Sequence, residues 1–159
     1  AQHEAAPQAL RGELGVAGNI TDKWAISAGY TYTDAKLTDA GYDNVGGVWV
    51  PSPDTGNKLH YIAPHSFAFW TTYDVTEQWR IGGGATYTSK RYMNSANTAI
   101  LPSQWRVDLM SSYQFNEKAS LQLNVNNVFD EKLYDASHVG LFANVQPGRN
   151  ATVKFNYKF

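Results

Sequence analysis

The sequence contains no cysteine and no long apolar segment. The absence of cysteine excludes a disulfide scaffold, a thiolate metal site and a cysteine nucleophile. No run of about 18 apolar residues is present, so the sequence predicts no transmembrane helix. Residues 1–4 have neither the basic nor the apolar region of a signal peptide. We therefore expect either that a leader has been removed or that the chain is a piece of a longer protein.

Charge is also sparse, because charged residues make up 17% of the chain against about 25% in typical soluble domains. The 13 basic and 14 acidic residues give a net charge of −1. Such a chain lacks the basic face that nucleic-acid binding requires, so we expect no nucleic-acid partner.

Motifs of catalysis and metal binding are missing as well. No G-x-S-x-G motif occurs, and the glycine run 82–84 lies inside a predicted strand rather than between a strand and a helix. The four histidines, at positions 3, 60, 65 and 138, show no spacing of metal ligands. We therefore expect no enzymatic activity, no metal site and no cofactor.

What the sequence has instead is regular alternation of apolar and polar residues. Within residues 119–129, Leu121, Leu123 and Val125 share one face, while Gln122 and Asn124 share the other. A period of two predicts a strand with one apolar face. The same pattern, less regular in the first three segments, predicts seven strands of about ten residues, long enough for tilted strands to cross a bilayer. They are residues 11–20, 24–33, 66–75, 79–90, 105–115, 119–129 and 150–159.

The connections between these segments alternate in length. Residues 21–23, 76–78 and 116–118 are short polar turns, whereas residues 34–58, 91–103 and 130–147 are long and rich in Gly, Asn, Asp, Ser and Pro. A soluble meander has no reason to sort its connections by side. An outer-membrane barrel does, with short turns toward the periplasm and long loops outside. The sequence therefore predicts an all-β, antiparallel transmembrane β-barrel segment.

Aromatic residues, 14% of the chain, recur at the ends of the predicted strands. Trp24 precedes Tyr32 by eight residues, and Trp79 precedes Tyr87 by the same interval. This spacing is typical of interfacial girdles, although Trp and Tyr are also simply good strand residues. Alternation alone permits the opposite orientation, a soluble sandwich or lipocalin-like barrel with its apolar face inside. The separation of short and long connections to opposite sides, and the position of the rings at the strand ends, favour an apolar face that points outward.

Seven strands are too few to close a barrel of this class, which needs an even number and at least eight. We expect residues 1–9, which contain Pro7, to be irregular, and residues 10–159 to form the C-terminal strands of a larger barrel. Unpaired strand edges in lipid leave backbone groups unsatisfied at several kcal/mol each. The chain is therefore expected not to close alone and to have open edges at residues 11–20 and 150–159.

Two motifs near the C-terminus resemble those of TonB-dependent outer-membrane receptors. The run Leu123-x-Val125-x-Asn127-Val128-Phe129-Asp130, followed by Tyr134, is similar to the end of their penultimate strand. Their last strand begins after a turn like Pro147-Gly148-Arg149 and ends like Tyr157-x-Phe159. Residues 10–16 also look like a strand start in siderophore receptors of this class. The ferric-catecholate branch is the most similar.

The resemblance implies a 22-stranded receptor that binds a ferric siderophore outside the cell and imports it with inner-membrane energy. It also implies partners: the siderophore, the TonB system acting through a plug domain, the lipid bilayer, and the assembly machinery, which would recognise Tyr157 and Phe159. Neither the plug nor the energy-coupling box of the family is present in this chain, and Leu133 stands where many members have a tyrosine. The alternative functions are a small autonomous outer-membrane barrel with an adhesive or structural role, and a soluble barrel for an apolar ligand.

A ferric catecholate is anionic and aromatic, so the resemblance implies that cations and rings near the outer mouth capture it. By strand parity, Lys90, Tyr92 and Arg106 point inward near the outer ends of their strands. The long loops contain four further candidates, Tyr42, Trp49, His138 and Phe142. Simpler roles stay open: Arg106 pairs with Asp108, and the loop rings pack locally or anchor at the interface. Trp70 points inward by parity and is expected to pack on a plug.

Overall fold

The computed structural model describes residues 6–135 and 142–159. These residues hold eleven strands: β1 (Ala6–Thr21), β2 (Trp24–Asp39), β3 (Tyr42–Val45), β4 (Val48–Pro51), β5 (His65–Asp74), β6 (Trp79–Thr88), β7 (Arg91–Tyr92), β8 (Ile100–Leu101), β9 (Gln104–Gln114), β10 (Ala119–Asn126) and β11 (Asn150–Tyr157). Within the described ranges no helix is long and apolar enough to cross a membrane.

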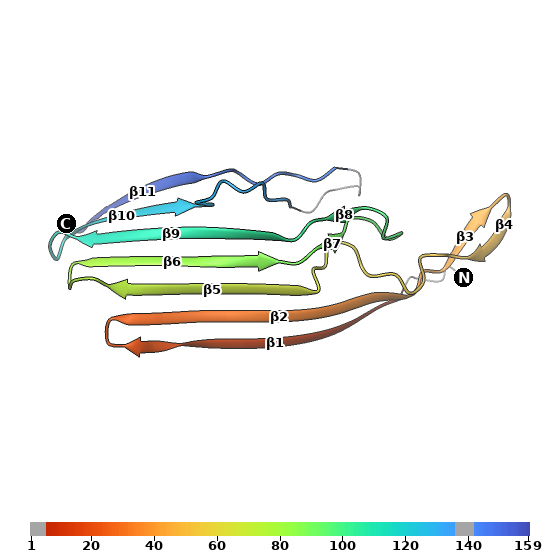
Figure 1. The fold of residues 1–159 in the computed structure, drawn as a ribbon. Helices are drawn as coiled ribbons and strands as arrows, with labels where there is room; N and C mark the ends of the chain where they lie inside the picture. The colour runs from red at the N-terminus through yellow and green to blue at the C-terminus, as the bar shows by residue number, and fades with distance from the viewer. Residues whose placement is uncertain (1–5, 136–141) are drawn as a thin grey trace.

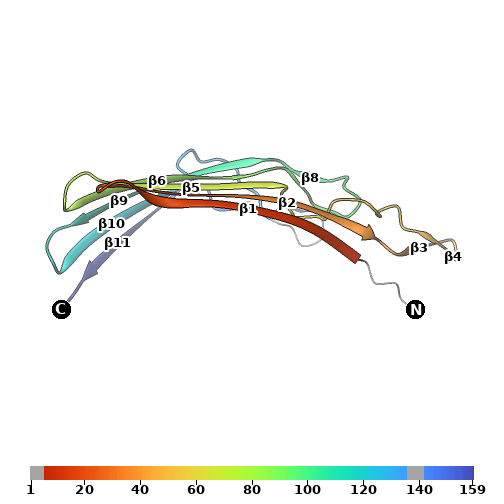
Figure 2. The same ribbon diagram turned by 90° about the horizontal axis from the view of Figure 1, so that it is seen from below.

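Seven of the strands form one antiparallel sheet in the order β1-β2-β5-β6-β9-β10-β11. Figure 1 shows them side by side, and Figure 2 shows that they form a single curved layer. Strands β1 and β11 lie at the two edges, and the sheet does not close on itself. The seven predicted strands and the two predicted open edges are therefore confirmed.

The strand boundaries differ from the prediction by three or more residues in three places. Strand β2 continues to Asp39, six residues beyond its predicted end at residue 33, so residues 34–39 are strand rather than loop. Strand β1 begins at Ala6, so residues 6–9 are not irregular as expected. Pro7 is tolerated because β1 is an edge strand and the register shifts between Ala6 and Pro7. Strand β10 ends at Asn126 rather than at residue 129, because Asn127 has a left-handed backbone with φ 52°.

The connections are sorted by side as predicted. In Figure 1 the three short turns lie at the left end of the sheet and the long connections at the right. Side-chain oxygens cap the short turns: Thr76 Oγ1 accepts from the backbone N–H of Trp79 at 3.0 Å, and Asn116 Oδ1 accepts from that of Ala119 at 3.0 Å. Such local bonds are the reason that Thr and Asn favour tight turns.

The long connections contain two small hairpins that the sequence analysis treated as loop. Strands β3 and β4 pair around Gly46 and Gly47, whose φ values of 62° and 90° suit a two-residue hairpin turn. Strands β7 and β8 form the second hairpin. In Figure 1 the β3–β4 hairpin extends well beyond the ends of the other strands.

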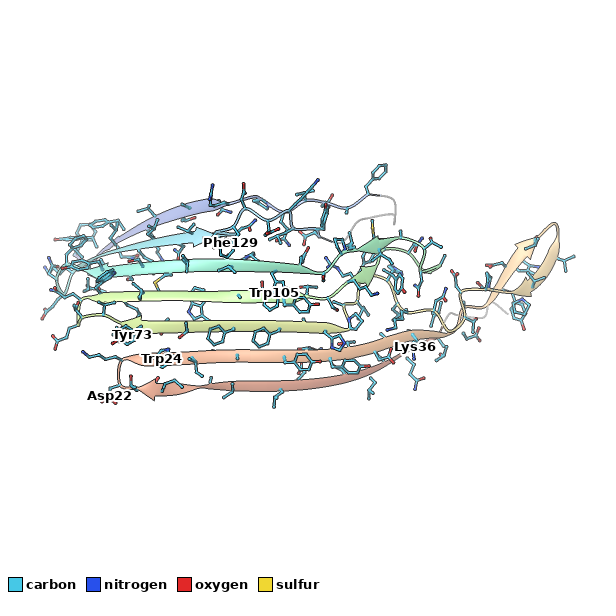
Figure 3. All side chains as sticks on the ribbon, in the orientation of Figure 1. Asp22, Trp24, Lys36, Tyr73, Trp105 and Phe129 are labelled. Atoms are coloured by element: carbon cyan, nitrogen blue, oxygen red, sulfur yellow. The ribbon has the colours of Figure 1, made fainter. Side chains whose placement is uncertain are left out.

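One face of the seven-stranded sheet, here called the apolar face, carries two rows of aromatic rings. Near the long connections, Tyr30, Phe67, Tyr87 and Trp105 occupy successive paired positions across β2, β5, β6 and β9. Near the short turns, Trp24 pairs with Tyr73, and Trp79 pairs with Tyr113. In Figure 3 Trp24 and Tyr73 lie toward the short-turn end and Trp105 toward the other.

The rows are six residues apart on β2 and β5 and eight residues apart on β6 and β9, about 20–26 Å along the strand, which is of the order of the apolar band of about 25 Å in such barrels. Between the rows, no residue that the seven strands place on this face is charged. The face is also uncovered on the interior strands, since Leu109 of β9 is 47% exposed and Leu123 of β10 39% exposed. A soluble sandwich would bury such a surface, so the described sheet does not support that alternative.

The opposite face, here called the polar face, carries Ser, Thr, Asn, Gln and the charged residues of the seven strands, except Asp34 and Lys36 of β2, which lie beyond the aromatic row on the same side as Tyr30. Trp70 lies on it, as parity predicted, opposite Gly84. A Cβ added at Gly84 would lie 2.3 Å from the backbone oxygen of Phe69 and 2.5 Å from Cε3 of Trp70. The glycine run 82–84 therefore makes room inside a strand, and Gly84 in particular admits the Trp70 ring.

Candidate functional site

The polar face carries an ion pair near the long connections. The guanidinium Nη2 of Arg106 donates to Oδ2 of Asp108 at 2.7 Å, and its Nε donates to the same carboxylate at 2.9 Å. Both residues lie on β9, two positions apart, so strand alternation places them on one face. Arg106 therefore pairs with Asp108, which is the simpler role considered for it. Any ligand that reaches Arg106 meets a guanidinium whose charge is already balanced.

Asp108 also fixes the end of β10, because its Oδ1 accepts a hydrogen bond from the backbone N–H of Asn127 at 2.9 Å. The Asn127 side chain is only 2% exposed. Its Nδ2 donates to the Glu131 backbone oxygen at 2.8 Å, and its Oδ1 accepts from the Glu131 N–H at 3.0 Å. These two hydrogen bonds of the side-chain amide stabilise the tight turn that follows β10.

The second C-terminal motif, at residues 147–149, is hydrogen-bonded to the first, at residues 123–130. Oδ1 of Asp130 accepts from the backbone N–H of Arg149 at 2.7 Å, and Arg149 Nη1 donates to the Val128 oxygen at 3.4 Å. The neighbouring Gly148 leaves no room for a side chain beside Asp130. These motif residues therefore join the end of β10 to the start of β11. Pro147 and Phe129 lie at the surface, and Phe129 is 70% exposed (Figure 3).

A buried arginine that the sequence analysis did not single out lies beside this motif. Arg91 is 8% exposed, and its Nη2 donates to the backbone oxygen of Tyr134 at 2.7 Å. Gln104 binds the same segment through the Tyr134 oxygen and N–H, at 3.2 and 2.8 Å. Burial lowers the pKa of the Arg91 guanidinium, and the charge of Asp135 acts in the opposite direction. Its Nη1 is buried and has no hydrogen-bond partner within the described part of the chain.

Lys90 and Tyr92, two of the predicted ligand residues, meet at one small cavity of about 60 Å³. Its lining residues are Lys58, Ile62, Pro64, Lys90, Arg91, Tyr92 and Ile100. Three of these side chains are cationic, and one is a phenol. Such a cavity suits an anionic group, because a cation and a ring can both contact it.

The remaining predicted ligand residues that the structure describes do not join this cavity. Tyr42 and Trp49, 55% and 67% exposed, lie on the projecting β3–β4 hairpin. Phe142 is 74% exposed in the connection before β11, and His138 lies outside the described residues. No sequence signal pointed to Arg91, because its partner is a backbone oxygen 43 residues away.

The two residues predicted to serve in assembly lie at the C-terminal end. The rings of Tyr157 and Phe159 pack edge to face with centroids 5.3 Å apart, and Phe159 is fully exposed. Across residues 6–135 and 142–159 no three His, Asp or Glu side chains gather closely enough to hold a metal ion.

Comparisons with known proteins identify the family of this chain. The model of the TonB dependent receptor-like β-barrel matches residues 12–128. A probable TonB-dependent siderophore receptor, PiuA of Acinetobacter baumannii, is 40% identical over 148 residues, which cover 92% of this chain and 20% of that protein. The catecholate siderophore receptor Fiu of Escherichia coli K12 is 32% identical over 122 residues, covering 74% of this chain and 15% of that protein.

Among solved structures, the crystal structure of the siderophore receptor PiuA from A. baumannii superposes with a TM-score of 0.87 at 38% identity. The match covers 96% of this chain and 22% of the PiuA chain. The chain spans about a fifth of the length of the curated relatives that it matches first. The chain belongs to the TonB-dependent receptor β-barrel family.

Proposed function

We propose that this chain forms part of the barrel wall and of the outer loops of an outer-membrane receptor. The receptor would bind a ferric siderophore at the cell surface and import it. The observation that carries the proposal is the 40% identity, over 92% of the chain, to a probable TonB-dependent siderophore receptor. The geometry agrees with it: an uncharged apolar face between two aromatic rows suits lipid, and a polar face suits an aqueous lumen. Energy for import would come from TonB through a plug domain outside this chain.

The ligand would be anionic, with a ferric catecholate favoured by the likeness to a catecholate receptor. We assign to Lys90 and Tyr92, which line a cavity of about 60 Å³ with two further cations, a contact with one anionic group of the ligand, whose bulk would lie outside this cavity. Arg106 would contribute to ligand binding through its ion pair, which lies on the polar face near the long-connection end of β9. The rings of the long connections, Tyr42, Trp49, His138 and Phe142, would make earlier contacts at the surface.

The proposal is tested with the receptor that contains this chain, expressed in a strain that lacks its own siderophore receptors. Uptake of ⁵⁵Fe is measured with ferric 2,3-dihydroxybenzoate and, for comparison, with the ferric hydroxamate ferrioxamine B. We expect uptake of the catecholate that stops when TonB is deleted. Absence of uptake of both chelates, or uptake that continues without TonB, would contradict the proposal.

The ligand residues are tested by the double variant Lys90→Gln/Tyr92→Leu. Its matched control is Lys118→Gln in a short turn at the opposite end of the sheet. Removing a charge-assisted contact worth about 1.5–3 kcal/mol predicts at least tenfold weaker binding of the catecholate. The control is expected to bind like the unmodified receptor, and equal binding by both variants would exclude Lys90 and Tyr92 from the site.

A further inference from the structure

The apolar face contains a groove of about 780 Å³ in its half nearest the short turns. The groove crosses five neighbouring strands, β2, β5, β6, β9 and β10, a distance of about 19 Å at the usual strand spacing. Figure 3 shows two of its residues, Trp24 and Tyr73, toward the short-turn end. The large side chains of the apolar face that line it are Trp24, Tyr73, Ile81, Leu109, Leu123 and Val125. The groove is therefore formed by the sheet itself and not by its connections.

Small residues in the middle of the groove create it. Gly83 of β6 pairs with Thr71 on one side and with Leu109 on the other. A Cβ added at Gly83 would lie 2.9 Å from Cδ2 of Leu109, so the leucine side chain leans over the glycine. Ser111 occupies the next apolar-face position on β9. The surface is therefore lower here than at the aromatic rows.

The hydroxyl groups of the groove are already hydrogen-bonded within the sheet. Trp24 Nε1 donates to Oγ1 of Thr71 at 2.8 Å, and that hydroxyl donates to a backbone oxygen of β2 at 3.0 Å. Trp79 Nε1 donates to Oγ of Ser111 at 2.9 Å. The Tyr73 phenol belongs to the aromatic row, at the level where lipid headgroups begin. None of the described residues that line the groove is charged. A polar ligand would therefore gain few hydrogen bonds here.

These properties suit a hydrocarbon chain. The volume lies within the range of small-molecule sites, about 300–1,000 Å³. An acyl chain in a groove contacts protein atoms on several sides, whereas one on a flat wall contacts them on one side only. The chain therefore gains dispersion energy by entering the groove. The short turns of outer-membrane barrels face the periplasm, so the groove lies at the level of the leaflet on that side.

We propose that this groove holds one acyl chain of a phospholipid from the periplasmic leaflet, so that this lipid stays bound while its neighbours exchange. The inference rests on the proposed placement of the chain in the wall of an outer-membrane barrel and does not depend on the siderophore. Recognition is of the acyl chain and not of the headgroup, because the described lining offers no charge to a headgroup.

The test uses the detergent-purified receptor that contains this chain, with retained lipids counted by native mass spectrometry. Palmitoyl-oleoyl phosphatidylethanolamine and phosphatidylglycerol have the same acyl chains and different headgroups. We expect both to be retained equally. Gly83→Leu, which fills the groove, should retain one lipid fewer than the unmodified receptor. The matched control is Gly18→Leu on β1, in the same row of paired positions but outside the groove, where a Cβ meets nothing within 4 Å.

A second measurement needs no variant and so does not depend on the folding of Gly83→Leu. The unmodified receptor is placed in vesicles with a phospholipid that carries a diazirine on its acyl chain, and the photoadducts are located by peptide mass spectrometry. We expect adducts to concentrate at Leu109 and Leu123, which line the groove, and to be sparse at Val16, which lies on the apolar face of β1 outside it.

Four results would overturn the inference: equal lipid counts for Gly83→Leu and the unmodified receptor, adducts spread evenly over the apolar face, retention of only one of the two headgroups, or receptor dimers that Gly83→Leu dissociates. The last result would assign the groove to a second copy of the receptor. Retention of the lipid by a receptor that fails the ⁵⁵Fe uptake test would leave this inference standing and contradict only the proposed import function.

Discussion

The carboxylate of Asp130 accepts a 2.7 Å hydrogen bond from the backbone N–H of Arg149, 19 residues further along the chain. A Cβ at Gly148 would lie 2.7 Å from the same carboxylate oxygen. Two short motifs, separate in sequence, therefore form one structural unit that closes the connection between β10 and β11. Asn127 supports this unit from inside the turn, where it is almost fully buried.

Asn127→Ala is expected to loosen this unit. The change removes two hydrogen bonds to the Glu131 backbone, a cost of about 1–3 kcal/mol. Hydrogen exchange of residues 127–135 should accelerate in the intact receptor, while exchange in β5 stays slow. Asn44→Ala, in the projecting hairpin, serves as the control. Unchanged exchange in the variant would show that Asn127 has no structural role.

Gly84→Ala is expected to destabilise the barrel wall, because its Cβ would collide with the Phe69 backbone oxygen and the Trp70 ring. Overpacking of this kind costs about 1–3 kcal/mol. Gly29→Ala is the matched control, since a Cβ there meets nothing within 4 Å. Urea unfolding of the receptor should show a lower midpoint for Gly84→Ala alone. Equal midpoints would contradict the close packing of Trp70.

Replacing Trp70 as well should not fully rescue that variant. In Gly84→Ala/Trp70→Leu the ring is gone, but the Phe69 backbone oxygen, which lies closer, remains. The unfolding midpoint of the double variant should therefore stay below that of Trp70→Leu alone.

The alternation of residues predicted much of this fold. Alternation within the segment indicated that β10 exists and which of its residues share the apolar face, namely Leu121, Leu123 and Val125. A period of two can be recognised from neighbouring residues alone. The end of β10 was wrong by three residues, since it depends on the left-handed backbone of Asn127. The β3–β4 hairpin was missed although Gly46 and Gly47 carry its turn signal, because the whole segment was assigned to a loop.

The candidate site was less predictable. The Arg106–Asp108 pair follows from their spacing on one strand, so sequence reasoning could identify it. Arg91 could not be found in this way, because it is buried against a backbone oxygen contributed by a distant connection. Contacts of that kind depend on the path of the chain and leave no pattern in the sequence.

The Arg106–Asp108 pair should behave as a coupled unit. Among the described residues, Arg106→Gln leaves the Asp108 carboxylate without its cation and with the neutral Asn127 backbone N–H as a hydrogen-bond donor. A double-mutant cycle with Asp108→Asn is expected to give a coupling free energy of about 1 kcal/mol, as for partly exposed pairs. It is measured from the unfolding free energies of the four receptors. Strictly additive effects would show that the pair contributes nothing.

Phe159→Ser is expected to reduce the amount of receptor assembled in the outer membrane, because the exposed terminal ring would be the signal for assembly. Phe142→Ser is the control, since Phe142 is also highly exposed but lies in a long connection. Heat-modifiable receptor in outer-membrane fractions is quantified for both. Normal assembly of the Phe159 variant would remove the case for that role.

The orientation of the two faces is tested most directly by single cysteines along β10, a strand of a chain with no cysteine of its own. Positions 121, 123 and 125 lie on the apolar face, and positions 120, 122 and 124 lie on the polar face. In the receptor in lipid vesicles, depleted of other reactive cysteines, we expect an alternating pattern of labelling. A lipid-soluble maleimide should react at the odd positions, and a charged, water-soluble maleimide at the even ones. The reverse pattern would mean that the apolar face does not contact lipid and would contradict the assignment of this chain to a membrane-spanning barrel wall.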